Sequence, residues 1–120
     1  MSAVVEDRLP TDGEALDAYS TVVTTVAQRL LPSVASLRVT QRIPGAGGGR
    51  RTRGAGSAVV LSGDGYLVTS AHVVDQADGG EATFSDGRTL DFTIVGSDPL
   101  SDLAVIRAQV PSQAPGLVPA

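Results

Sequence analysis

One histidine and one aspartate, thirty residues apart, are the residues of this chain best suited to acid–base chemistry. His72 is the only histidine, and it follows a run of small residues, 69–71, at the end of an apolar segment. Imidazole can take and return a proton near neutral pH, provided that a carboxylate accepts from its Nδ1–H and fixes one tautomer. Asp102 is the best partner, because it lies between a proline-containing turn and an apolar run, where its charge needs a hydrogen-bond donor. Asp98 is the second candidate, although the following Pro99 favours a turn-capping role.

A histidine beside an aspartate is also compatible with a purely structural hydrogen bond, and this alternative stays open from the residues alone. A metal site is not predicted, because the chain has one histidine, no cysteine and no ligand spacing. A cofactor is not predicted either. The glycine-rich run 45–50 ends in Arg50 and precedes a run of strand type, unlike a dinucleotide-binding fingerprint.

The histidine is predicted to stand at the end of a β-hairpin. Two apolar runs, 58–61 and 66–68, flank the sequence Gly63-Asp64-Gly65. Asp-Gly between such runs is a strong hairpin signal, because glycine readily takes the positive φ that the turn requires. The end of a strand is a rigid place to hold a reactive group.

Four further segments are predicted as strands from their alternating or continuous apolar residues: 35–40, 82–84, 90–94 and 103–106. With the hairpin they make six short strands joined by turns, and no strand alternates with a helix. This pattern predicts an all-β domain, a small antiparallel barrel that leaves no open sheet edge. Residues 41–53 are rich in glycine and hold four arginines. They are predicted as a mobile loop whose arginines are solvated or bind an anion.

One helix is predicted ahead of the barrel. The run Thr11-Asp12-Gly13-Glu14 fits a capping box, and apolar residues then recur at spacings of three and four. The helix should end near Leu31, because Pro32 lacks an amide and restricts its predecessor. We predict a disordered N terminus over 1–13, a helix over 14–31 and a barrel over 33–110. The apolar face of the helix is expected to dock on the core, with an oligomer-forming arm as the alternative.

Composition limits the partners. A length of 120 residues suits one small domain, and the net charge of −4 gives no general attraction to nucleic acid or anionic membranes. No apolar run approaches the ~20 residues of a membrane span. The acidic first 20 residues are unlike a signal peptide. Neither a nucleic-acid partner nor a membrane segment is predicted, and the sequence assigns no compartment.

Three segments follow one another in the chain: G-S-A-V-V-L-S-G-D-G-Y-L-V-T-S-A-H-V-V (56–74), F-S-D-G-R (84–88) and V-G-S-D-P-L-S-D-L-A-V-I-R (95–107). Together they resemble the first half of a trypsin-like serine protease of the HtrA/Deg group. The resemblance implies a six-stranded antiparallel barrel, the first half of a chymotrypsin/trypsin-like double barrel. It implies that His72 is the catalytic base and Asp102 the orienting acid. It further implies that residues 111–120 begin the linker to a second barrel.

The nucleophile of that family lies in a G-N-S-G-G segment on the second barrel, and no such segment occurs here. Ser70 is predicted to end a strand and Ser101 to lie in a turn, so no nucleophile is predicted in this chain. The resemblance implies a serine endopeptidase to which this chain contributes the base and the acid, and the 120 residues alone are expected to be inactive. The implied partners are a protein or peptide substrate and a second barrel, whose contact face would be apolar and exposed here. Members of the family also form homo-oligomers through N-terminal segments, and the family usually works outside the cytoplasm.

Two other interpretations stay open: a non-catalytic interaction or assembly barrel, and an inactive homologue that keeps His72 and Asp102 but has lost the serine. The downstream reading frame distinguishes them, because a G-N-S-G-G segment within the next ~100 residues would make the parent protein an enzyme.

Overall fold

The structure, a computed structural model, describes residues 11–45 and 47–120. The chain divides into two compact units, one ending at Leu30 and one spanning Leu31–Ala120, which are described separately. Most of the predicted disordered segment 1–13, namely residues 1–10, lies outside the described residues.

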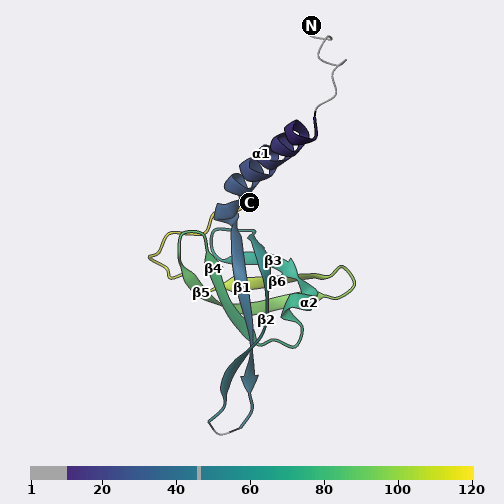
Figure 1. Ribbon diagram of the computed structural model, residues 1–120. Coiled ribbons are helices and arrows are strands. Elements are labelled where there is room, and N and C mark those ends of the chain that lie inside the picture. Colours follow the sequence, from purple (N-terminus) through teal and green to yellow (C-terminus); the bar gives the residue numbers. More distant parts are fainter. Residues whose placement is uncertain (1–10, 46) are drawn as a thin grey trace. The chain divides into compact units, whose positions relative to one another are not determined.

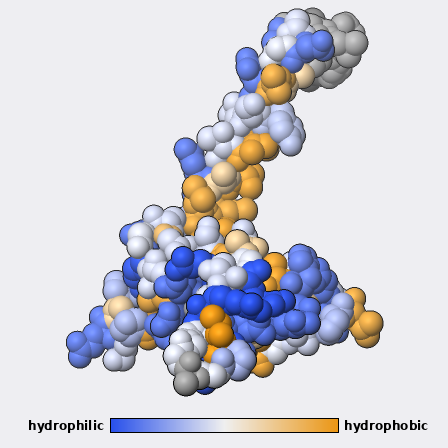
Figure 2. Space-filling view, turned by 60° about the horizontal axis from the view of Figure 1, so that its bottom comes forward, coloured by the Kyte–Doolittle hydropathy of each residue, from blue (hydrophilic) through white to orange (hydrophobic). Residues whose placement is uncertain are grey.

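The first unit contains helix α1 (Asp12–Leu30). Its N terminus is capped as the sequence predicts, because Thr11 Oγ1 accepts a hydrogen bond from the Glu14 N–H at 3.1 Å. No residue of α1 is buried. Its large apolar side chains gather on one side (Figure 2): Leu16, Tyr19, Val22, Val23, Val26 and Leu30. The docking of this face and its alternative role as an oligomer-forming arm both stay predictions.

None of the described helices combines the length and the apolar character that crossing a bilayer requires.

The second unit is a closed barrel of six strands, and every pair of neighbouring strands is antiparallel (Figure 1). The strands follow one another around the barrel in the order β1-β2-β3-β6-β5-β4. The all-β prediction of a six-stranded antiparallel barrel with one N-terminal helix is therefore confirmed. The elements are η2 (Leu31–Ser33), β1 (Val34–Ile43), β2 (Gly49–Val60), β3 (Tyr66–Ser70), α2 (Ala71–Val74), β4 (Gly79–Phe84), β5 (Thr89–Asp98) and β6 (Leu103–Ala108).

Aliphatic side chains fill the barrel. The largest fully buried ones come from four different strands: Val39, Val60, Leu67 and Ile106. Phe84 and Phe92 complete the core. Alternation along each strand sends these residues inward and their neighbours outward, which is how a two-residue repeat builds a closed interior.

The prediction of a loop over residues 41–53 is wrong for most of this segment. Strand β1 continues to Ile43 and β2 begins at Gly49, so the segment is a long hairpin that projects from one end of the barrel (Figure 1). The glycines act only at the tip, where Gly45 and Gly47 take positive φ values of 101° and 75°. Cross-strand pairing on both sides of the tip therefore extends the sheet where composition alone suggested disorder.

The C-terminal residues 111–120 have no helix or strand but are fixed to the barrel. The Leu117 side chain is buried, and its N–H donates to the Gly63 carbonyl at 2.9 Å. Arg88 Nη1 donates to the Pro115 carbonyl at 2.6 Å. This segment consequently covers the end of the barrel at the β2–β3 turn.

Candidate active site

Pairing between β3 and β6 brings His72 and Asp102 to the same end of the barrel. Ser70, the last residue of β3, pairs with Leu103, the first residue of β6. The chain turns into α2 directly after Ser70, and the Ala71 N–H donates to the Asp102 carbonyl at 3.0 Å. His72 and Asp102, separated by thirty residues in sequence, are therefore adjacent at two neighbouring strand ends.

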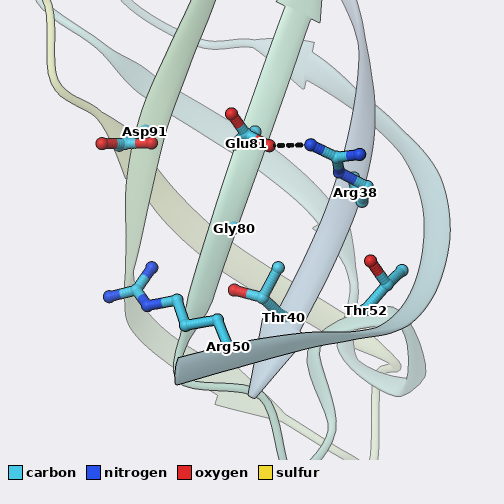
Figure 3. A pocket seen from close by; sticks show the side chains of 7 residues that line it. All are labelled: Arg38, Thr40, Arg50, Thr52, Gly80, Glu81 and Asp91. Carbon is cyan, nitrogen blue, oxygen red and sulfur yellow. Dashed lines mark hydrogen bonds and ion pairs between the residues drawn. The ribbon is translucent and has the colours of Figure 1, made fainter. Parts of the chain in front are cut away.

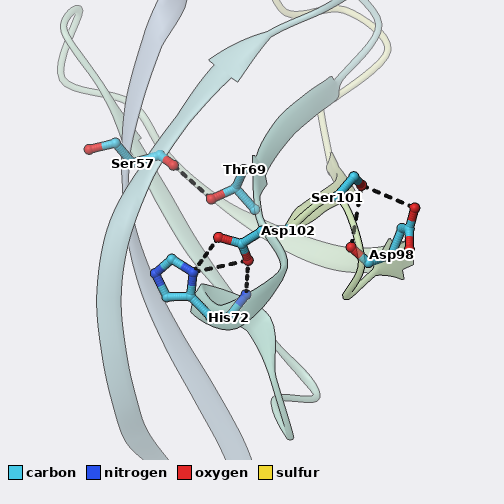
Figure 4. Close-up of polar contacts among 6 residues, drawn as sticks. All are labelled: Ser57, Thr69, His72, Asp98, Ser101 and Asp102. Atoms are coloured by element: carbon cyan, nitrogen blue, oxygen red, sulfur yellow. Dashed lines mark hydrogen bonds and ion pairs between the residues drawn. The ribbon is translucent and has the colours of Figure 1, made fainter.

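The aspartate bonds both the backbone and the ring of the histidine (Figure 4). His72 Nδ1 lies 2.8 Å from Oδ2 and 3.0 Å from Oδ1 of Asp102. The His72 N–H also donates to Oδ1, at 3.0 Å. A carboxylate can only accept, so Nδ1 carries the proton and the other ring nitrogen, Nε2, is left as the basic atom. The structure thus brings together the two residues that the sequence paired.

Asp98, the second candidate, caps the turn that precedes Asp102. It accepts from the Leu100 N–H at 3.0 Å and from the Ser101 hydroxyl at 3.1 Å. Figure 4 shows this pair pointing away from the His72 ring. These hydrogen bonds give Asp98 the turn-capping role that the following proline led us to expect.

Asp102 itself has an unusual backbone conformation. Its φ is +57°, in the left-handed region, where asparagine and aspartate are tolerated better than most other residues. Left-handed residues of this kind gather at functional sites, where the surrounding structure holds them in place. Here the holding contacts are the hydrogen bonds from Ala71 and His72.

These contacts change the acidity of the aspartate. The backbone N–H of His72, and after it the imidazole, hold the pKa of the Asp102 carboxyl below its ordinary value of 3.8. Hydrogen bonds that favour the ionised form have this effect. A carboxyl with a lowered folded-state pKa contributes stability that is fully present above pH 3.8 and is lost as the pH falls through the lower folded value.

We therefore expect the Asp102 carboxyl to titrate below 3.8, the ordinary value of an aspartate. Carboxyl carbon chemical shifts followed by NMR between pH 2 and pH 6, about the acid range of this side chain, measure the midpoint. Replacing His72 with alanine should raise the Asp102 midpoint only in part, because the backbone N–H remains. A midpoint at or above 3.8 in the unmodified chain would contradict the contact.

The site is open to solvent. The side chains of His72 and Asp102 are 73% and 51% exposed. They line a hollow of about 270 Å³ together with four other residues: Ala71, Asp75, Ser97 and Pro99. An imidazole with a free Nε2 at the edge of such a hollow can exchange a proton with a group brought in from outside.

A larger hollow, of about 320 Å³, lies on another surface, across β1, β2, β4 and β5 (Figure 3). Arg38 and Glu81 form an ion pair there, and Arg50 and Asp91 line the same hollow. It holds charges of both signs but neither a histidine nor a serine, so we place the candidate chemistry at His72. Within the part of the chain that the structure describes, no three histidine, aspartate or glutamate side chains gather as metal ligands would.

Sequence reasoning missed how closely β2 supports α2. A Cβ atom built on Gly56 would lie 2.8 Å from both methyl carbons of Val73, the residue after His72. The Thr69 hydroxyl donates to the Ser57 carbonyl at 2.7 Å and ties the end of β3 to the same stretch of β2. The signal was a glycine inside a strand, which often marks a close approach of another segment.

Gly56→Ala is therefore expected to displace α2 and disturb the His72–Asp102 contact. Overpacking of this kind destabilises by about 1–3 kcal/mol. Urea denaturation measures the loss, and the imidazole proton signals of His72 report the change at the site. Gly56→Ala combined with Val73→Ala should recover most of both, because the smaller side chain vacates the space. A Gly56→Ala chain with unchanged stability and unchanged His72 signals would contradict this packing argument.

The described serines near the site form no hydrogen bond with the histidine ring. The Ser101 hydroxyl bonds Asp98, and Ser70 ends β3. Ser57 projects away from His72 (Figure 4). None of the serines in the described residues forms a hydrogen bond with the imidazole. The described part of the chain thus brings an imidazole and a carboxylate together, with no serine bonded to the ring.

The comparisons with known proteins agree with one another on the kind of protein that this chain resembles. The family model of the trypsin-like peptidase domain matches residues 56–120. The chain is 46% identical over 70 residues to the periplasmic serine endoprotease DegP of Escherichia coli, and 39% identical over 93 residues to the serine protease PepD of Mycobacterium tuberculosis. It is 43% identical over 58 residues to a probable DegP-like periplasmic serine endoprotease of Brucella suis.

These matches cover 56%, 70% and 48% of this chain but only 15%, 18% and 11% of the respective relatives. The chain therefore spans less than a fifth of the length of each of these three relatives. The matches agree with the resemblance to the HtrA/Deg group that the three sequence segments indicated.

Proposed function

This chain belongs to the trypsin-like peptidase family, and we propose that it supplies the general base and the orienting acid of a serine endopeptidase. His72 is the base and Asp102 the acid in this proposal. The observation that carries it is the contact of His72 Nδ1 with Asp102 Oδ2 at 2.8 Å, which leaves Nε2 free at an open hollow. A solely structural hydrogen bond does not require so exposed a ring.

The proposed reaction uses these groups in sequence. Nε2 of His72 removes the proton from a serine hydroxyl as the oxygen attacks the carbonyl carbon of a peptide bond. The resulting imidazolium, stabilised by the Asp102 carboxylate, then gives that proton to the nitrogen of the leaving amine as the C–N bond breaks. Water deacylates the serine by the same proton transfers in reverse order. Asp102 stays ionised throughout and holds the ring in one orientation.

The serine has to come from polypeptide outside the 120 residues. Two exposed apolar side chains that flank Asp102 closely in the chain support a covering surface there: Leu100 and Leu103 are 99% and 53% exposed. Leu103 also lines an apolar hollow with Ala104 and Val105. Exposed apolar clusters of this kind mark contact surfaces. We propose that a second barrel, carrying the nucleophile, packs against this face.

The proposed substrate is a protein or peptide, since the relatives with named activities are serine proteases. The exposed apolar face of α1 supports a further proposal, that the helix joins copies of the protein into a homo-oligomer. Both proposals extend beyond the barrel itself.

A second candidate function is a non-catalytic interaction barrel, or an inactive homologue. It is favoured by one observation, that no serine among the described residues bonds the His72 ring. A reading frame that lacks a G-N-S-G-G segment would decide for it.

The test is peptide hydrolysis by the longest polypeptide that the reading frame containing this chain encodes. Turnover that disappears when His72 is replaced supports the proposal. Turnover that survives the replacement contradicts it.

A further inference from the structure

Two arginines of the β1–β2 hairpin are held by neutral amide groups instead of carboxylates. Gln41 Oε1 accepts from Arg53 Nη1 at 3.1 Å and from Arg51 Nη2 at 3.4 Å. Gln76 Oε1 accepts from Arg53 Nη2 at 3.3 Å. By contrast, Arg38 and Arg88 are paired with carboxylates. The two guanidinium groups are thus brought together and oriented while their charge is not neutralised by these bonds.

A β-bulge explains why the two side chains meet. Val39 pairs with Gly54 and Thr40 pairs with Thr52, so Arg53 is an extra residue with no partner in β1. A bulge re-aims the side chains of the strand that contains it. Here it lets Arg51 and Arg53 both reach Gln41, whose Cα partner is Arg51. The hairpin is exposed along this stretch, and hydrophilic residues dominate the end of the barrel that faces the reader in Figure 2.

The same stretch of β2 has an open edge. Strand β2 pairs with β3 only at Val59 and Val60. Val73 packs against Gly56, and Thr69 bonds the Ser57 carbonyl, so these two residues are already covered. Apart from the bulged Arg53, residues 51–55 pair with β1 on one side, and among the described residues they pair with no strand on the other. Unpaired backbone groups of this kind are a template for an added strand.

The open edge lies next to the candidate active site. Gly56, the residue next to the open edge, contacts Val73 of α2, the helical turn that carries His72. Gln76, which follows that turn, bonds Arg53 directly. A chain segment lying along residues 51–55 would therefore run from the arginines toward the histidine.

We infer that this edge binds an extended peptide segment with an acidic side chain, and that Arg51 and Arg53 recognise the carboxylate. The inference rests on the proposed function for one point only, that this peptide is the substrate. A guanidinium offers five N–H donors, so each arginine keeps donors for a carboxylate while it bonds a glutamine. The glutamines hold the arginines in place in advance, which lowers the entropy lost on binding.

A peptide fits the observations better than a nucleic acid does. The net charge of the chain is −4, which repels a long polyanion. An open strand edge offers alternating backbone donors and acceptors, which a peptide can match and a phosphate backbone cannot. Arg51 and Arg53 therefore act as specificity-determining residues for acidic peptide segments.

The experiment measures binding to the 120-residue chain by fluorescence anisotropy at low salt. The probe is a fluorescein-labelled peptide of alternating valine, threonine and glutamate, and the matched probe has glutamine in place of glutamate. We expect the glutamate peptide to bind at least tenfold more tightly, or roughly the effect of one charge-assisted hydrogen bond. Arg53→Gln and Arg51→Gln should each weaken it about tenfold, and added NaCl should weaken it further.

Arg42→Gln is the matched control, because it removes the same charge from the same hairpin. Arg42 pairs with Arg50, one position from the Gln41–Arg51 pair, so its side chain points to the other face. It should change the affinity less than threefold or so, in line with its distance from the carboxylate. A loss as large as that of Arg53→Gln, or equal binding of the glutamine peptide, would overturn the inference. So would a duplex DNA probe that competes with the peptide at equal concentration.

This test is independent of the proposed catalysis. Binding does not require a serine, whereas the proposed function is judged by hydrolysis in the longer polypeptide. Peptide binding that depends on Arg53, together with a hydrolysis rate indifferent to His72, would preserve this inference and reject the proposed function. Hydrolysis that depends on His72 and is indifferent to glutamate in the peptide, with no binding effect of Arg53→Gln, would do the reverse.

Discussion

Replacing His72 with alanine, in the longest polypeptide that its reading frame encodes, is expected to lower kcat for a peptide substrate by about 10⁶-fold. His72 is the only histidine of the chain, so the sequence offers no second imidazole to take the proton of an incoming serine. Without a base the hydroxyl stays a weak nucleophile, and the leaving amine finds no acid. Initial rates of hydrolysis of a chromogenic peptide measure the loss.

Asp102→Asn should lower kcat by about 10⁴-fold while leaving the fold intact. An asparagine at this position can still accept from the His72 N–H, because one of its side-chain atoms is an oxygen like Oδ1. It cannot both accept from Nδ1–H and stabilise the imidazolium as a carboxylate does. The histidine would then favour the wrong tautomer for the reaction.

Asp98→Asn is the matched control for this substitution. Asp98 lies in the same turn and loses the same charge, but it bonds Leu100 and Ser101 instead of the histidine. We expect its kcat to change by less than about threefold, the effect of one screened surface charge. A large loss for Asp98→Asn and none for Asp102→Asn would show that Asp98, and not Asp102, orients the histidine.

The 120-residue chain by itself is expected to show no hydrolysis of casein. It holds no serine in the nucleophile context of the family, and those oxyanion donors that the second barrel would contribute are missing as well. Turnover by the pure chain that is unaffected by His72→Ala would indicate a different catalytic site.

The sequence could predict the barrel, because its strands follow from local patterns, and it could predict that His72 and Asp102 are partners, whereas their catalytic roles stay a proposal. Apolar alternation, with Asp-Gly turns near residues 64 and 86, specifies short antiparallel strands, and closure then leaves few arrangements. Asp102 could be chosen as the partner of His72 because it lies between a proline-containing turn and an apolar run, and the pairing of β3 with β6 in the structure brings the two together. The structure adds that Asp102 also accepts a hydrogen bond from the backbone N–H of His72, which no residue pattern predicts.

The hairpin formed by residues 41–53 could not be predicted in the same way. Its glycines indicate disorder on composition, yet those at the tip serve only the turn, and pairs such as Thr40 with Thr52 continue the sheet. Propensity is a weak guide where cross-strand pairing decides the outcome. The Gly56–Val73 contact escapes prediction for a related reason, since it joins two segments that only the closed barrel brings together.

Ile106→Ala is expected to destabilise the barrel by about 2–5 kcal/mol, the usual cost of a cavity in a packed core. Ile106 is completely buried, and its Cα partners are Leu67 on β3 and Ile94 on β5. A small domain has about 5–15 kcal/mol of stability in total, so this loss is a large share. Thermal denaturation followed by circular dichroism should show a Tm lower by at least about 8 °C.

Leu100→Ala is the control, because it removes an aliphatic side chain of the same size that is 99% exposed. Its free energy of unfolding should stay within about 0.5 kcal/mol of the unmodified chain. We expect the His72–Asp102 contact to be lost together with the core on unfolding. The reason is that β6 begins directly after Asp102, and its pairing with β3 holds His72 opposite that aspartate. The urea midpoint read from the His72 imidazole signals should therefore shift by the same amount as the midpoint read from circular dichroism. Loss of the His72 signals well before the barrel unfolds would mean that the His72–Asp102 contact is not fixed by strand pairing.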